Sequence, residues 1–127
     1  MFMMKIQTSR EDYLKALLVL EKRGGDIRSV DLARYQNVSK PSVSHAVALL
    51  KEEGYITVDD DFFLHLTAAG REIAEKVYER HCFFTKHLVE AGVDKDVAAR
   101  DACLMEHVIS DQSFEKLKEK LDSDSQK

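Results

Sequence analysis

SKPSVSHAVALLK, residues 39–51, is the stretch that decides the fold. It predicts the start of a helix, because Ser39 can cap free backbone N–H groups and Pro41 falls in the first turn, where its missing N–H costs nothing. From Val43 to Leu50, apolar residues recur at every third or fourth position, the spacing of one buried helix face. The opposite face is small, polar and basic, and it carries Lys40, Ser42, Ser44, His45 and Lys51.

A shorter helix is expected just before this one. Residues 29–35 have room for two turns, with Ser29 as the cap, and the run stops at Gln36-Asn37. Two short helices joined by about four residues predict a helix-turn-helix, whose second helix enters the major groove of DNA. An ordinary helical hairpin is the alternative for these two helices taken alone. The expected DNA-contacting residues are Ser39, Lys40, Pro41, Ser42, Ser44 and His45.

A β-hairpin is predicted directly after the second helix. Residues 54–58 and 62–66 have the composition of strands, and Asp59-Asp60-Asp61 between them has the composition of a turn. A helix-turn-helix followed by a two-stranded wing is the order of a winged-helix domain. The acidic tip is unfavourable near phosphate, so we expect no strong contact between this wing and DNA.

The first helix of this domain is expected to begin near Thr8. Ser9 and Asp12 have the spacing of a capping box, apolar residues then follow the helical period, and Gly24-Gly25 ends the run.

The second half of the chain is predicted to be helical throughout. A long helix capped by Thr67 reaches Gly92, a second runs from about Asp94 to Ile109, and a third covers residues 111–121. The predicted fold is mostly α, with a winged helix-turn-helix DNA-binding domain followed by an α-helical metal-binding and dimerisation domain. We place the domains at residues 1–66 and 67–121, and we expect residues 122–127 to form a disordered tail.

Three potential metal ligands lie close together on the second of these helices. Cys103, Glu106 and His107 are spaced at i, i+3 and i+4, so a thiolate, a carboxylate and an imidazole share one face. This mixed set suits a divalent transition metal better than magnesium or calcium, which prefer oxygen ligands. The alternative is a buried free cysteine beside an exposed Glu-His pair.

Composition limits the possible functions. The 127 residues are 44% hydrophobic and contain one Pro and five Gly, which allows an ordinary core and favours helix. No stretch approaches the roughly 20 apolar residues of a membrane span, and the N-terminus does not resemble a cleaved leader, so we expect a cytoplasmic protein. In that reducing compartment, Cys82 and Cys103 should be free thiols or ligands. The net charge of −4 means that DNA binding requires a local basic face.

These features together resemble the diphtheria-toxin-repressor family of metal-dependent transcriptional regulators, in the short form without an SH3-like domain, like the manganese transport regulator. The resemblance covers about residues 8–120. The matching segments are residues 11–14 (EDYL), 38–44 (VSKPSVS), 66–70 (LTAAG), Arg80-His81, Ala102-Cys103 and 106–111 (EHVISD).

The resemblance implies a function and a set of ligands. Family members use Fe(II) or Mn(II) as a corepressor that orients the DNA-binding domains of a homodimer, which binds palindromic operators of metal-uptake genes. Carried over by motif, the metal ligands here are Asp12, His81, Cys103, Glu106 and His107. Zn(II) and Co(II) are expected to bind in vitro.

This chain departs from both branches of that family. Asp12 matches the manganese branch, whereas Cys103 matches the iron branch. Lys15, Thr85 and Ala99 replace further ligands of one branch or the other. We therefore expect one full site per subunit, with His81 either joining it or holding a weak second ion.

Other functions remain possible for the same residues. A winged-helix regulator controlled by a small ligand, or by oxidation of Cys103, would respond to that ligand or oxidant instead of a metal. A metal-dependent enzyme needs a general base and a substrate pocket, for which the sequence has no motif. A metal-storage or adaptor protein is disfavoured, because such a protein would need neither a helix-turn-helix nor a wing.

Overall fold

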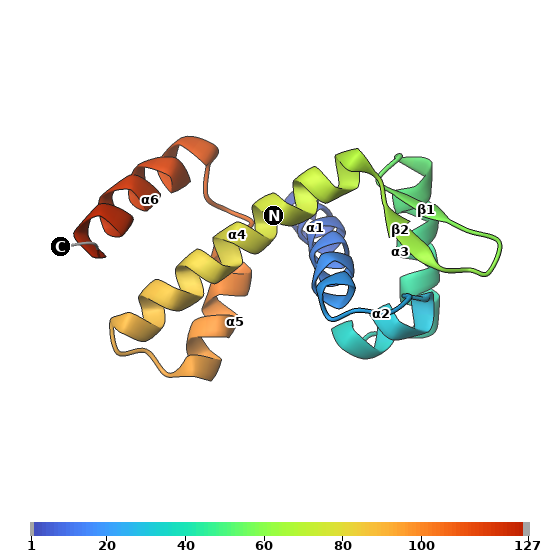
Figure 1. Cartoon of the computed structure of the whole chain (residues 1–127), viewed down its shortest axis with the longest axis horizontal. Coiled ribbons are helices and arrows are strands. Elements are labelled where there is room, and N and C mark those ends of the chain that lie inside the picture. Colours follow the sequence, from blue (N-terminus) through green and yellow to red (C-terminus); the bar gives the residue numbers. More distant parts are fainter. Residues whose placement is uncertain (1, 126–127) are drawn as a thin grey trace. The chain divides into compact units, whose positions relative to one another are not determined.

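The computed structural model describes the backbone of residues 2–125 and the side chains of residues 10–123. The chain forms two compact units, residues 1–76 and 77–127, and the division falls within a long helix, after the domain boundary placed between residues 66 and 67. The first unit contains three helices followed by a hairpin and the start of a fourth helix; the second contains the rest of that helix and two more (Figure 1). Among the described residues, no helix is both long enough and apolar enough to cross a bilayer.

Helix α1 (Phe2–Lys22) is longer at its start than expected. The predicted start near Thr8 is wrong, because the backbone is already helical from Phe2. Asp12 therefore lies well inside the helix, where a capping-box role does not apply. The side chain of Ser9 lies outside the described residues.

Helices α2 (Ser29–Gln36) and α3 (Lys40–Glu52) form the predicted helix-turn-helix. Ser39 caps α3 as expected, since its Oγ accepts a hydrogen bond from the Ser42 N–H at 3.2 Å. Ser29 is not the cap of α2: the capping position is Arg28, whose N–H donates to the Asp31 carboxylate at 2.9 Å. Asn37, at φ 56°, ends α2 in the left-handed conformation that its short amide tolerates.

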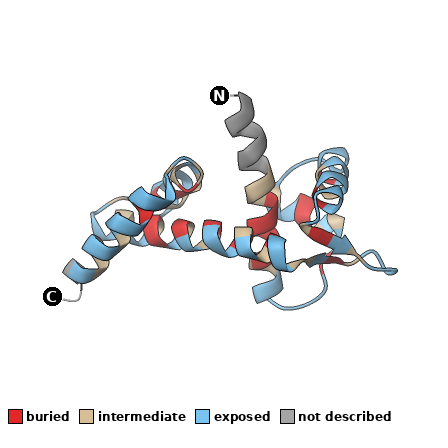
Figure 2. Cartoon of the chain, turned by 90° about the horizontal axis from the view of Figure 1, so that it is seen from above, coloured by how far each residue is buried: buried red, intermediate tan, exposed pale blue. Residues whose placement is uncertain are grey.

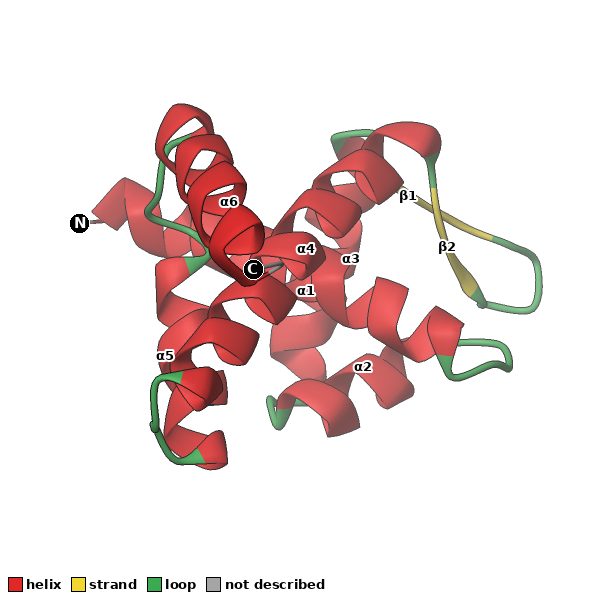
Figure 3. Cartoon of the chain, turned by 60° about the vertical axis from the view of Figure 1, so that its left-hand side comes forward, coloured by secondary structure: helices red, strands yellow, loops and turns green. Residues whose placement is uncertain are grey.

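The hairpin consists of β1 (Ile56–Val58) and β2 (Leu64–Leu66), which are shorter than the predicted strands (Figure 3). They pair antiparallel, with Ile56 opposite Leu66 and Val58 opposite Leu64. Asp59 orders the turn, because its Oδ1 accepts hydrogen bonds from the Asp61 and Phe63 N–H groups at 2.9 and 3.0 Å. The winged-helix order is confirmed.

The core of the first unit is aliphatic and comes from all of its elements. The apolar face predicted for α3 is buried at both ends, at Val43 and Leu50. This face packs with residues of α1, α2 and the hairpin, seen as the red segments of that unit in Figure 2. The buried side chains include Leu14, Leu17, Leu18, Leu32, Ile56 and Leu64.

The second unit is built from α4 (Ala68–Glu90) after Lys76, α5 (Lys95–Met105) and α6 (Asp111–Ser125). Phe83 and Phe84 of α4 meet Phe114 of α6 edge to face, with ring centroids 5.2 and 5.9 Å apart. These rings and Ala102 form the core. Helix α6 continues through residues 122–125 of the segment predicted as a disordered tail, and residues 126–127 lie outside the described part.

Helix α5 ends earlier than predicted. Its cap is Asp94, as expected, but the helix stops at Met105 instead of Ile109. Glu106 still donates its N–H to the Ala102 carbonyl at 3.0 Å, and the Val108 N–H then turns to Met105 at 3.3 Å. The last two of the three adjacent ligands therefore lie where the helix ends.

Candidate metal centre

Four of the five predicted metal ligands belong to the second unit. His81 comes from the middle of α4 and Cys103 from the last turn of α5. Glu106 is the C-terminal cap of α5 and keeps a near-helical backbone, with φ −63° and ψ −19°, so it stays on the same side as Cys103. His107 follows in the segment that leads to α6.

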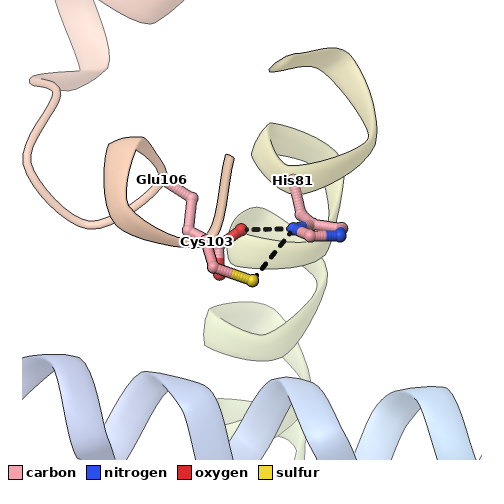
Figure 4. A group of neighbouring side chains, drawn as sticks. All are labelled: His81, Cys103 and Glu106. Atoms are coloured by element: carbon pink, nitrogen blue, oxygen red, sulfur yellow. Dashed lines mark hydrogen bonds and ion pairs between the residues drawn. The ribbon is translucent and has the colours of Figure 1, made fainter. Parts of the chain in front are cut away.

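His81, Cys103 and Glu106 form one cluster (Figure 4). Their potential ligand atoms all lie within 4.8 Å of one another. The His81 Nδ1 is 2.9 Å from the Glu106 Oε2 and 3.7 Å from the Cys103 Sγ. Figure 4 shows the three side chains converging from two helices.

Glu106 is the centre of this arrangement. Its side chain is fully buried, although a carboxylate is costly to bury unless it is paired. One oxygen faces His81, and the other, Oε1, is 3.3 Å from Nε2 of His107. The His107 side chain is itself only 2% exposed. Thus Glu106 lies between two imidazoles.

The expectation that Cys103, Glu106 and His107 share one helix face applies to the first two only, because the helix ends at Met105. His81 lies beside one oxygen of Glu106, with the Cys103 thiol next to the His81 ring, and His107 lies beside the other oxygen. The expected surface position of the Glu-His pair in the alternative reading is wrong, because both side chains are buried.

The donor set fits a divalent transition metal. A thiol, two imidazoles and a carboxylate are ligand types that zinc, iron, cobalt and manganese accept in different proportions. All four are half-buried or buried, and imidazoles that ligate metal are commonly oriented by such neighbouring carboxylates.

Asp12, the fifth predicted ligand, lies on α1 in the first unit. Its Oδ1 is 4.0 Å from the Nζ of Lys15, whose side chain is 10% exposed. The pKa of Tyr13 is raised, mainly by burial and further by the Asp12 charge. Asp12 remains a predicted ligand.

Two residues that replace family ligands of a second metal site lie on α4 and α5. Thr85 is on α4, and its buried Oγ1 makes no hydrogen bond among the described residues. Ala99 is half-buried on α5 and offers no ligand atom. Cys82 is exposed and, like Cys103, is not in a disulfide.

The predicted DNA-contacting residues all lie on the exposed surface at the start of α3. Ser39 and Ser42 are also engaged with each other, since the Ser39 hydroxyl donates to Ser42 Oγ at 2.9 Å. Ser42 and His45 line a groove of about 460 Å³ that is mostly apolar, with Val38 among its walls. DNA contact by these residues remains a prediction.

The sequence pattern indicates no role for Arg80 beyond its place beside His81, but the structure gives it specific partners. It is 6% exposed and donates from Nη1 to the Ile109 carbonyl at 2.8 Å. Its Nη2 donates to the Asp111 carboxylate. No local sequence pattern predicts that Asp111 is the partner of Arg80, because the two residues are 31 positions apart.

A winged-helix unit joined to a helical unit with a mixed thiol, imidazole and carboxylate cluster defines a class: DNA-binding regulators with a transition-metal centre. Residues 5–61 match the family of iron-dependent repressor N-terminal DNA-binding domains. Residues 67–126 match the metal-binding and dimerisation domain of iron-dependent repressors.

Individual relatives agree with these matches. The chain is 32% identical over 112 residues to an HTH-type transcriptional regulator from Methanocaldococcus jannaschii, covering 87% of this chain and 90% of that one. It is 32% identical over 105 residues to the transcriptional regulator MntR from Escherichia coli O157:H7, covering 83% and 68%. It is 32% identical over 103 residues to the diphtheria toxin repressor of Corynebacterium diphtheriae, covering 80% and 46%.

The fold agrees as well. The manganese regulator SloR aligns with a TM-score of 0.80 at 30% identity, covering 89% of this chain and 53% of that one. The chain thus spans about half the length of this solved structure. The chain belongs to the iron-dependent repressor family, and the expected metal-dependent, dimeric DNA-binding regulator is confirmed at that level.

Proposed function

We propose that this protein is a transcriptional repressor of metal-uptake genes, with Fe(II) or Mn(II) as corepressor. The observation that supports this proposal most directly is the buried Glu106 carboxylate between His81 and His107, with the Cys103 thiol close to His81. The proposed role is ligand binding and not catalysis. Its work on operator DNA would place the protein in the cytoplasm.

The proposed metal ligands are His81, Cys103, Glu106 and His107 of the second unit and Asp12 of the first. When bound, the metal supplies positive charge that holds the anionic and imidazole donors together. Because Asp12 belongs to the DNA-binding unit, its ligation would couple metal binding to the orientation of that unit. This role for Asp12 rests on the sequence resemblance.

The identity of the metal follows from the donor types. The thiol of Cys103 favours iron(II) over manganese(II), whereas SloR, a structural relative, is a manganese regulator. Co(II) and Zn(II) should bind tightly in vitro, because affinity rises from manganese through iron to cobalt, and zinc readily accepts thiolate and imidazole ligands. We propose one full site per subunit, since Lys15 places an ammonium group near Asp12.

The proposed DNA-reading element is α3. Ser39, Lys40, Pro41, Ser42, Ser44 and His45 are exposed there, and a homodimer would present two such helices to the two halves of a palindromic operator. The hairpin tip, with Asp59, Asp60 and Asp61, is proposed to stay clear of phosphate.

The proposed dimer interface involves the helices from residue 67 to residue 109. On α5 and just after it, Leu104 and Val108 are 67% and 62% exposed. Large apolar side chains this exposed are often covered in a dimer. Their positions support an interface on this side of the second unit.

The test is operator binding by the full chain under anaerobic conditions, with Fe(II), Mn(II), Co(II) and Zn(II) added separately. We expect at least one metal to strengthen binding tenfold or more, and Cys103→Ala to reduce that gain. Cys82→Ala is the matched control, because Cys82 is exposed and outside the cluster, and it should leave the gain unchanged. Operator binding that no metal changes would refute the proposal.

Acidity provides a second test of the same site. Ligation requires a deprotonated thiol and neutral imidazoles, so metal affinity should fall as the solution is acidified. Metal affinity that stays constant between about pH 8 and pH 5 would exclude Cys103 and the histidines as ligands.

A further inference from the structure

Arg80 is a buried charged residue that is not among the predicted metal ligands or DNA-contacting residues. Its side chain is 8% exposed, against 69% for its partner Asp111. The guanidinium group lies 5.2 Å from the centre of the Phe114 ring. A buried guanidinium group is costly unless it is paired, and here both terminal nitrogens have acceptors, although the buried Nε has none among the described residues.

Arg80 binds the end of the segment from Glu106 to Asp111, which leads from α5 to α6. At its start, the Glu106 N–H is bonded to α5, through the Ala102 carbonyl. At its end, Arg80 binds the carbonyl of Ile109 and the carboxylate of Asp111. Two neighbouring residues of α4 therefore act on this segment: Arg80 at its end and His81 at Glu106.

We propose that Arg80 is a positioning residue for the metal centre, which sets where the segment from Glu106 to Asp111 lies against α4. The inference rests on the proposed metal function and adds a residue to it. A planar guanidinium group can donate to two acceptors at a fixed angle, which a lysine ammonium group does not reproduce. Through these two contacts, Arg80 keeps Glu106 and His107 in place to receive a metal ion.

A matched control exists on the same two helices. Lys118 of α6 is 3.0 Å from the Glu79 carboxylate of α4, and both side chains are partly exposed. This ion pair also joins α4 to α6, but it does not bind the segment after Glu106. Lys118→Met therefore removes a contact between these helices without releasing that segment.

The experiment is an anaerobic titration of the full chain with Co(II), followed by the thiolate-to-cobalt charge-transfer band and the ligand-field bands. Variants are Arg80→Met, Arg80→Lys, Asp111→Ala and Lys118→Met, each checked by circular dichroism. We expect Arg80→Met to lower Co(II) affinity about tenfold to a hundredfold, as changes to residues that orient ligands do, and to alter the ligand-field bands. Arg80→Lys should recover only part of this loss, and Lys118→Met should stay within twofold of the wild type.

Several results would overturn the inference. It is wrong if folded Arg80→Met keeps wild-type affinity and bands, or if Lys118→Met loses as much affinity as Arg80→Met. If Arg80→Met does not fold, Asp111→Ala decides, because it removes the acceptor of the Arg80 Nη2 and because Asp111 is mostly exposed, so its replacement should be tolerated. Unchanged affinity in Asp111→Ala then overturns the inference. A wild type in which Co(II) produces neither the charge-transfer band nor ligand-field bands would instead refute the proposed metal site, and this inference with it.

Discussion

Gly70→Ala should destabilise the protein, although the same change inside an ordinary helix stabilises it. Gly70 is buried in the first turn of α4, where it faces the backbone of Tyr55. A Cβ added at Gly70 would lie 2.0 Å from the Tyr55 carbonyl oxygen and 2.9 Å from its carbonyl carbon. Backbone atoms cannot turn aside as a flexible side chain can, so either α4 or the backbone at Tyr55, just before β1, must move.

The magnitude follows from this contact. Reaching an ordinary separation of about 3.5 Å requires a shift of about 1.5 Å, and such overpacking costs about 1–3 kcal/mol. The shift also strains the hydrogen bond from the Thr67 N–H to the same carbonyl, now 3.0 Å long, at a cost of about 1 kcal/mol. Alanine returns at most about 1 kcal/mol through helix propensity. The free energy of unfolding should therefore fall by about 2 kcal/mol, which lowers the melting temperature by roughly 7–8 °C.

The assay is urea unfolding followed by circular dichroism, with Ala69→Gly as the control. Ala69 is the exposed neighbour of Gly70 in the same helical turn, and its change should cost at most about 1 kcal/mol. A Gly70→Ala variant as stable as the wild type, or more stable, would show that the approach of α4 to Tyr55 is not rigid.

Three further predictions concern single residues. Lys15→Glu should raise bound Mn(II) from one to two ions per subunit, because it replaces the ammonium group near Asp12 with a carboxylate; an unchanged count by equilibrium dialysis would contradict this. Phe62→Asn should raise the free energy of unfolding by about 0.5–1 kcal/mol, since Phe62 is 73% exposed at φ 67°, a conformation that asparagine adopts more easily. A loss of stability in urea would mean that the Phe62 ring makes stabilising contacts. Hydrogen bonds from His65 and the Phe63 backbone lower the pKa of Asp59 below its ordinary 3.8, so its stabilising effect is present above that value and is lost as pH falls below it. The difference in unfolding free energy between wild type and Asp59→Asn should thus shrink from about pH 6 to about pH 2, and a constant difference would exclude this role.

Local sequence was enough for most of the secondary structure. Ser39 and Pro41 at the start of α3, Thr67 before α4 and Asp94 before α5 act on groups within a few residues of themselves. Caps and hydrophobic periodicity are short-range properties, so they can be read without knowing the fold. The predicted helix ends were wrong at two places: α1 begins at Phe2 and not near Thr8, and α5 ends at Met105 and not at Ile109.

The sequence by itself determined the order of the winged-helix elements and which candidate ligand types lie near the end of α5. Only the tertiary structure decided that Glu106 lies between His81 and His107, and that Arg80 holds the segment after them. His81 and Glu106 are 25 residues apart and on different elements, so their approach depends on how α4 packs against α5 and the segment after it. Packing of this kind is settled by side-chain volumes across the whole core, which no local pattern contains.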